Sequence, residues 1–266
     1  MPLILTPIDH DDLCHGWRWE IADEADLARK VARVALGQYR HVAQILTEID
    51  KAAPPTRKET AAAAIKRLTV PDGGDPWHRD GWVFQTISWI AAHRTEKGIV
   101  ARAPHPIEAH KGFDGMQLRL DGEGKSVTAV VIFEDKASES PRKTIRTDVW
   151  NGIRALERGE RMSELVHDAT TILEAQQRVF PGLDVDEAIE TILWEEVRHY
   201  RVSITTAGTH AKDAARKKLF RGFDEAAPGE SGRRRADTMH FDDLRGWMTA
   251  FCKVAIKQIE DWRGDV

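Results

Sequence analysis

The sequence predicts an α/β (α+β) protein in which a small mixed sheet is flanked by helices. Residues 127–136 form an apolar run that ends in charged residues, and residues 199–206 alternate between apolar and polar side chains, as strands do. Residues 121–126 (DGEGKS) supply the glycines of a hairpin turn before the first of these strands. Longer stretches before, between and after them carry apolar residues at helical spacing.

Composition limits the kind of protein that the chain can be. Its 266 residues suit one large domain, or a core with a helical extension, and 41% of them are hydrophobic, enough for a substantial core. Charged residues make up 31% of the chain, as in soluble proteins, and the formal net charge is −4. This charge does not mark a general binder of polyanions, so a nucleic-acid surface has to be a local patch.

The cysteine content bears on the cellular compartment. Only Cys14 and Cys252 are present, far apart and without CxxC spacing, which excludes a thiolate zinc site and a disulfide framework. The first residues lack the basic and long apolar segments of a signal peptide, and no apolar stretch approaches transmembrane length. We therefore expect a cytoplasmic protein that is not bound to a membrane.

Residues 1–75 are expected to form a helical N-terminal region. Asp23 suits the N-cap of a helix whose apolar positions recur up to residue 49, and a shorter, alanine-rich helix is expected over residues 59–68. The break PDGGDP at residues 71–76 is rich in glycine and proline and is the best candidate boundary. It divides the chain into this region and a core over residues 76–266.

The predicted core begins with a helix and continues with a mixture of strands and helices. Ser140-Pro141 resembles an N-cap followed by proline at the first helical position, and Asp184 with Glu187 forms a capping-box pattern. In chain order we expect a helix over 80–95, a strand over 99–103, the hairpin over 111–138, helices over 140–159, 162–177 and 184–197, a strand over 199–206, a helix over 209–220, a loop over 226–235 and a last helix over 242–262.

The hairpin brings chemically active side chains together. Successive side chains of a strand point to opposite faces, so Glu134 and Lys136 share one face while Asp135 lies on the other. If the two strands pair, Asp114 at the start of the first approaches Glu134 and Lys136 at the end of the second. Two carboxylates and an ammonium suit a hard divalent cation and the water that it activates.

The order of elements and these residues resemble the PD-(D/E)xK nuclease superfamily, which has the restriction-endonuclease-like fold. The resemblance rests on residues 112–115 (GFDG) and 133–136 (FEDK), and it covers roughly residues 78–220. It implies that Asp114 and Glu134 bind Mg²⁺ or Mn²⁺, with the carbonyl of Asp135 as a further ligand. It also implies that Lys136 activates the attacking water, so that Asp114, Glu134 and Lys136 are the catalytic residues.

One expected feature of that superfamily is missing. Many members carry a glutamate on the first core helix, where this chain offers Asp80 and Gln85, and neither is assigned a catalytic role. A structural interpretation of the hairpin also remains open, with Asp114 as a turn residue and Glu134 and Lys136 as an ordinary salt bridge.

Other constellations are weaker. The cluster HDDLCH at residues 10–15 fits a polar turn before a helix better than a metal site, because no second pair of ligands stands nearby. His167-Asp168 resembles part of a metal-dependent phosphohydrolase motif, but no helix supplies its earlier histidine and later aspartate.

Basic residues beside the hairpin suggest contacts with nucleic acid. Arg142, Lys143 and Arg146 follow the second strand directly, where they are expected to bind phosphates near the scissile one. Basic groups at residues 216–221 and 233–235 are expected to contact a duplex at longer range, or to be solvated faces.

The sequence therefore predicts a magnesium-dependent nuclease acting on DNA. Nucleases of this kind with extra helical segments resemble restriction or antiviral defence effectors, and a separate ATPase or helicase subunit is an expected partner because the chain has no nucleotide-hydrolysis motif. A homodimer is expected by the same analogy, since a duplex has two strands to cut. Two alternatives remain open: a non-catalytic nucleic-acid-binding or assembly subunit that keeps the fold, and a helical interaction protein in which the hairpin is structural.

Overall fold

A computed structural model describes residues 1–47, 52–95, 100–104, 112–210 and 212–263. Ile99, Lys111, residues 48–51 and Ala211, which fall within predicted elements, lie outside these ranges.

Seven strands of the described chain form one mixed sheet in the order β1-β2-β7-β6-β5-β4-β3. Neighbouring strands β2, β7, β6 and β5 run parallel, while β1, β4 and β3 run antiparallel to the strand that each joins. The strands are β1 (Leu3–Asp9), β2 (His15–Ile21), β3 (Val100–Ala101), β4 (Gly115–Leu120), β5 (Val127–Lys136), β6 (Arg198–Thr206) and β7 (Arg234–His240).

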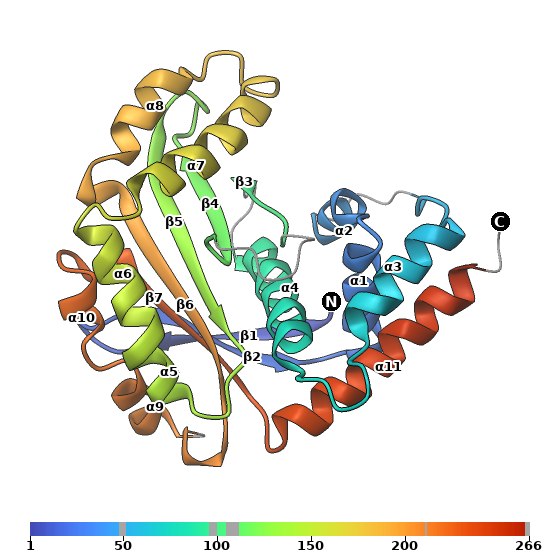
Figure 1. Ribbon diagram of the computed structural model, residues 1–266. Coiled ribbons are helices and arrows are strands. Elements are labelled where there is room, and N and C mark those ends of the chain that lie inside the picture. Colours follow the sequence, from blue (N-terminus) through green and yellow to red (C-terminus); the bar gives the residue numbers. More distant parts are fainter. Residues whose placement is uncertain (48–51, 96–99, 105–111, 211, 264–266) are drawn as a thin grey trace.

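Helices cover both faces of the sheet (Figure 1). Helices α1 to α4 and α11 lie on one side, and α5 to α10 lie on the other. The helices are α1 (Glu24–Ala35), α2 (Tyr39–Leu46), α3 (Lys58–Leu68), α4 (Trp77–Thr95), α5 (Pro141–Thr144), a π-helical turn (Ile145–Val149) that joins it to α6 (Trp150–Glu157), α7 (Met162–Gln177), α8 (Val185–Ile192), α9 (Asp213–Leu219), α10 (Phe223–Ala226) and α11 (Leu244–Arg263).

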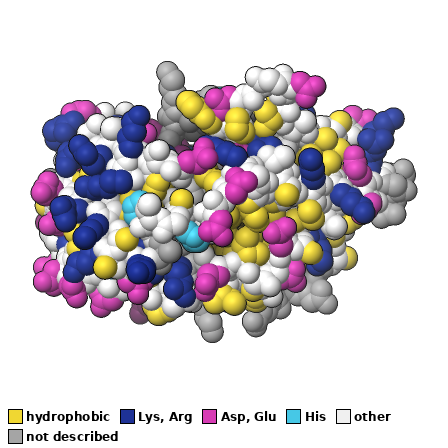
Figure 2. All heavy atoms as spheres, turned by 90° about the horizontal axis from the view of Figure 1, so that it is seen from below, with side chains coloured by type: hydrophobic (Ala, Val, Ile, Leu, Met, Phe, Trp, Pro, Cys, Tyr) yellow, Lys and Arg dark blue, Asp and Glu magenta, His cyan; other side chains and the backbone are white. Residues whose placement is uncertain are grey.

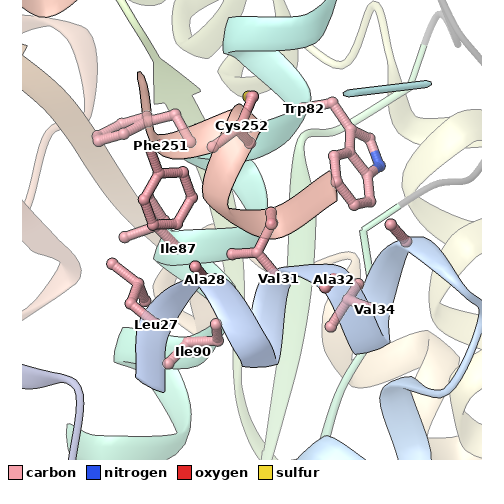
Figure 3. Close-up of a cluster of buried hydrophobic side chains, with 14 of the residues drawn as sticks. Leu27, Ala28, Val31, Ala32, Val34, Trp82, Ile87, Ile90, Phe251 and Cys252 are labelled. Carbon is pink, nitrogen blue, oxygen red and sulfur yellow. The ribbon is translucent and has the colours of Figure 1, made fainter. Parts of the chain in front are cut away.

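A large apolar core holds the first group of helices against the sheet (Figure 3). Leu27 and Val31 are one helical turn apart on α1, and both are fully buried against Ile87 of α4 and Phe251 of α11. Each such side chain contributes about 1.5–3 kcal/mol when it is buried. A second core, built around β5, β6, α6 and α7, fills the opposite face. This second core packs against one face of β5 and β6, and Ala92 of α4 packs with Val131 and Phe133 on the other face of β5.

The predicted mixed sheet flanked by helices is confirmed, and several elements match closely. Strand β5 and helix α7 have the predicted bounds, and the predicted helix over 140–159 is one continuous run through the π-helical turn. None of the described helices combines the length and apolarity that crossing a bilayer requires.

The prediction for the N-terminal region was wrong at its start. Helices α1, α2 and α3 confirm the helical prediction from Glu24 onward, but β1 and β2 form an antiparallel hairpin before them. The cluster at residues 10–15 is the turn of this hairpin, and β2 pairs in parallel with β7, so the first 21 residues belong to the main sheet. Trp17 and Trp19 alternate with polar residues on β2, a short strand pattern that the sequence interpretation passed over.

The predicted loop over residues 226–235 was also wrong at its end. Strand β7 begins at Arg234 and is buried almost throughout, although its sequence RRADTMH lacks a run of apolar residues. Ion pairs and carbonyl contacts, rather than apolar packing, satisfy its side chains, so the usual hydrophobic signal of a buried strand is missing. The predicted helix over 209–220 is a 3₁₀ turn followed by the shorter α9.

Candidate functional site

Pairing of β4 with β5 fixes the first two residues of the site. Gly115 is opposite Phe133 in the register, and Asp114 directly precedes β4, so Asp114 stands beside the last residues of β5. Because β5 is buried between two helical layers, its end is rigidly placed. The alternation expected from the sequence is therefore realised with the predicted pairing.

Asp114, Glu134 and Lys136 form one group of contacting charges, called here the site cluster. Lys136 Nζ lies 2.5 Å from Asp114 Oδ2 and 3.0 Å from Glu134 Oε2. All three side chains are half-buried, with 27% of the Lys136 side chain exposed. The structure thus brings together the three residues that the sequence predicted to be catalytic.

Burial and mutual attraction shift the protonation of the cluster. Burial raises the pKa of Glu134, and the nearby Lys136 opposes that shift. Burial alone would lower the pKa of Lys136, but Glu134 and Asp114 together outweigh it, so the net pKa of Lys136 is raised. Lys136 is therefore a charged ammonium that donates hydrogen bonds and does not accept a proton while both carboxylates hold it.

A glutamine from α4, Gln85, also contacts the site cluster. Gln85 Nε2 donates to Asp114 Oδ1 at 2.7 Å, and the backbone N–H of Asp135 donates to Asp114 Oδ2 at 2.8 Å. Asp80, the other acidic candidate of that helix, lies elsewhere: it pairs with Arg79 and Arg245. Of the two α4 residues considered from the sequence, Gln85 is the one that touches the site cluster.

Asp135 points its carboxylate away from the site cluster. Ser88 Oγ donates to Asp135 Oδ1 at 2.7 Å on the face covered by α4. Burial raises the pKa of Asp135 to about 7, and Arg201 partly offsets that rise. The side chain of Asp135 therefore belongs to an internal polar network, and only its backbone borders the site.

Arg161, at the start of α7, was missed in the sequence. Its Nη1 lies 3.8 Å from Glu134 Oε1, and its guanidinium stacks over the Phe113 ring at 4.3 Å. Glu164 holds it from the other side, with Oε1 2.8 Å from Nη2. Nothing in the local sequence signals this contact, because it depends on how α7 folds back over the β4–β5 hairpin.

The oxygen atoms of the cluster fit a hard cation that needs few protein ligands. Asp114 and Glu134 are the acidic side chains of the cluster, and among the described residues no three His, Cys, Asp or Glu side chains gather closely enough to hold a metal ion by themselves. Mg²⁺ keeps several waters and commonly takes one or two protein carboxylates plus substrate phosphate. Such an ion fits here only if Lys136 gives up part of its contact with the carboxylates.

A pocket of about 480 Å³ opens beside the cluster. Asp114, Lys136 and Gln85 line it from one side, and Trp77 lies on its rim from the first turn of α4. Its walls also include Asp135 and the hydroxyl residues after β5, so solvent and a small polar ligand have access to the Asp114 carboxylate, whereas Glu134 is not among the lining residues.

The predicted phosphate-binding residues lie on the helix after β5. Lys143 and Arg146 are exposed. Arg142 is tied down, because its Nη1 donates to the carbonyl oxygens of Leu219 and Arg221 at 2.8 and 2.9 Å. Figure 2 shows Lys and Arg side chains gathered at the end of the molecule that carries α5 and α9.

The basic residues 233–235 are structural, whereas Lys217, Lys218 and Arg221 of the other group are exposed. Arg233, Arg234 and Arg235 are buried, and Arg234 donates to the carbonyl oxygen of Leu13 across the N-terminal turn. Arg216 is buried as well. The expectation that residues 233–235 contact a duplex or form a solvated face was wrong, because these side chains fasten the start of β7 to the surrounding loops.

No known protein family model matches the chain, and no curated protein matches it either.

Proposed function

We propose that the protein is a metal-dependent nuclease that hydrolyses phosphodiester bonds of DNA with Mg²⁺ or Mn²⁺. One observation carries this proposal: a lysine lies within 3.0 Å of an aspartate and a glutamate at the ends of two paired strands, and the aspartate and lysine line an open pocket. Buried charges are costly, and this group is placed where a ligand can reach it.

The arrangement of elements around the site supports the proposal. Helix α4 is followed by β3, β4 and β5, then by the α5–α6 helix, and β6 returns in parallel beside β5. This is the order on which the resemblance to PD-(D/E)xK nucleases rests, and the matching residues stand at the corresponding strand ends. A role in antiviral defence, and a separate ATPase or helicase partner, are proposed by the same analogy.

Each residue of the cluster has a role in that reaction. Asp114 and Glu134 hold the cation, which when bound supplies positive charge for the phosphate and lowers the pKa of a bound water. Lys136, charged and already oriented by both carboxylates, donates hydrogen bonds to the attacking water or to a phosphate oxygen. Gln85 keeps Asp114 oriented from the opposite side.

A second function is favoured by the ion pairs within the site cluster. Lys136 pairs with both carboxylates at once, and its raised pKa keeps it charged. The same geometry therefore suits a non-catalytic nucleic-acid-binding subunit in which the charges hold the hairpin together.

Incubation with DNA separates the two functions. Supercoiled plasmid and single-stranded DNA are incubated with the protein in Mg²⁺ or in EDTA, beside Asp114→Asn. The control is Glu123→Gln, an exposed acid at the opposite end of the same hairpin. Cleavage in Mg²⁺ that is lost in EDTA and in Asp114→Asn, but kept in Glu123→Gln, supports the nuclease. Cleavage that survives EDTA, or binding without cleavage, rejects it.

A further inference from the structure

The pocket beside the site cluster has one wall made by a single face of α4. Trp77, Gly81 and Gln85 are four residues apart and all line it, so they stack along one side of the helix. Gln85 at the inner end touches Asp114, and Trp77 at the outer end stands at the rim. This wall therefore leads from solvent to the site cluster.

Trp77 is unusually open for so large an apolar side chain. Its relative exposure is 69%, although its backbone is anchored by a hydrogen bond from its N–H to Asp75 Oδ1 at 3.0 Å. An anchored aromatic ring with a free face, next to a polar pocket, is the platform on which nucleobases stack.

Gly81 leaves the middle of the wall bare. Glycine in the interior of a helix is unfavourable compared with alanine, and a Cβ added to Gly81 would meet no protein atom within 4 Å. Packing within the protein therefore gives no reason for a glycine here. The missing side chain instead leaves flat space between Trp77 and Gln85, in which a planar group fits.

The opposite wall is polar, and its one exposed carboxylate, Glu139, is paired with Arg245. Ser138, Ser140 and Thr144 line it, and the Ser138 and Thr144 hydroxyl oxygens are 2.7 Å apart. Hydroxyl groups and lysines are common partners of phosphate oxygens, and Lys136 stands at the inner end of this wall. The pocket thus pairs an aromatic platform with phosphate-binding groups.

We propose that this pocket receives an unpaired nucleotide next to the scissile phosphate, with its base on Trp77 and its phosphate toward Lys136. A base inside a duplex has both faces covered by its neighbours, so the site selects single-stranded or frayed DNA over intact duplex. This inference rests on the proposed nuclease function and names its substrate class.

Binding in EDTA tests the inference without cleavage. Anisotropy of a labelled single-stranded oligodeoxynucleotide and of its blunt duplex is measured with wild type, Trp77→Ala and Trp77→Phe. The matched control is Trp194→Ala, a tryptophan that is 68% exposed near α8, away from the pocket. We expect Trp77→Ala to weaken single-strand binding by about 5- to 100-fold, with Trp77→Phe restoring most of it and Trp194→Ala unchanged. Duplex binding should change little.

Gly81→Leu gives a second test, because it adds a side chain to this wall at a position where a Cβ meets no protein atom within 4 Å. It should weaken single-strand binding as well. The inference is overturned if wild type does not bind the single strand, if Trp77→Ala binds it as wild type does, or if Trp77→Ala weakens single strand and duplex equally.

The two proposals fail in different ways. Single-strand binding that depends on Trp77 in a protein that never cleaves DNA retains the pocket and rejects the nuclease. Cleavage that depends on Mg²⁺ but is equal for Trp77→Ala and wild type on single strands retains the nuclease and rejects the pocket.

Discussion

Strand β5 carries ionisable side chains on both faces, and the two faces place them in different surroundings. On one face Glu134 and Lys136 meet Asp114 beside an open pocket. On the other face Asp135 is buried against α4, where Ser88 donates to its carboxylate, and it lies near Arg201, which pairs with Asp237 at 2.8 Å. Arg235 joins the same aspartate, with 3.0 Å between its Nη2 and Asp237 Oδ2. We call Asp135, Arg201, Arg235 and Asp237 the buried network.

The difference lies in solvent access rather than in residue type. Both groups contain carboxylates and basic side chains in contact, yet Arg201 and Asp237 are fully buried whereas the site cluster borders a pocket. Arg201 and Asp237 have no exposed surface for a ligand to reach, so their charges serve the fold, whereas Asp114 and Lys136 have both charge and access to the pocket. Changes in the buried network should therefore affect stability, and changes in the site cluster should affect activity.

The largest expected effect comes from Asp237→Ala. This change leaves Arg201 and Arg235 buried without their carboxylate, and breaking a buried ion pair costs about 3–5 kcal/mol. In urea unfolding, the free energy of unfolding should fall by an amount at the upper end of this range. Glu134→Gln, on the open face, serves as comparison and should cost much less. Equal losses for the two variants would contradict the distinction between the faces.

Lys136→Met, in the site cluster, should affect activity rather than stability. It removes the ammonium that orients the water and phosphate but keeps an unbranched side chain, so single-turnover cleavage in Mg²⁺ should fall about 100-fold or more. Metal binding should persist, because the two carboxylates lose their competitor. Cleavage by Lys136→Met at the wild-type rate would show that the lysine is structural.

A pH series sharpens the comparison on the sealed face. Burial raises the pKa of Asp135 to about 7, so the folded protein binds a proton that the unfolded chain releases near pH 4. The stability from this group is complete at low pH and is lost as pH rises toward 7. Between pH 5 and pH 8 in EDTA, the free energy of unfolding measured with urea should fall by about 2–3 kcal/mol more for wild type than for Asp135→Asn. Parallel pH profiles for the two proteins would contradict this assignment.

The smallest expected effect is at Gly81. Alanine there meets no protein atom and suits the helix interior, so Gly81→Ala should stabilise the protein by about 0.5–1 kcal/mol. Gly222→Ala is the matched contrast, because Gly222 has a φ of +88° that alanine adopts only with strain, and it should destabilise. Thermal unfolding of both variants measures the difference, and a loss of stability in Gly81→Ala would contradict the open space around it.

The sequence predicted the site cluster because its members are linked by local rules. Alternation along β5 put Glu134 and Lys136 on one face, and a short hairpin brought Asp114 to them. Gln85 and Arg161 come from helices that are distant in sequence, so their contacts depend on tertiary packing. Gln85 was considered from the sequence only because of its residue type, and no feature of the sequence indicated Arg161.

The sheet was predicted in part for a similar reason. Strands with apolar runs or alternation, such as β5 and β6, were found, and β7 was missed because arginines and aspartate fill its buried positions. Its burial is possible only because Asp237 and nearby carbonyl groups satisfy those arginines. The pairing of β2 with β7 joins segments more than 200 residues apart, which no local pattern encodes.

The most direct test of the proposed site is the single-turnover cleavage rate of Glu134→Gln in Mg²⁺, compared with wild type and with Glu123→Gln at equal folded fractions. Glutamine keeps the shape of the side chain but removes the charge that holds the cation. We expect Glu134→Gln to cleave DNA at least about 100-fold more slowly, while Glu123→Gln matches wild type. Cleavage by Glu134→Gln at the wild-type rate would contradict this expectation.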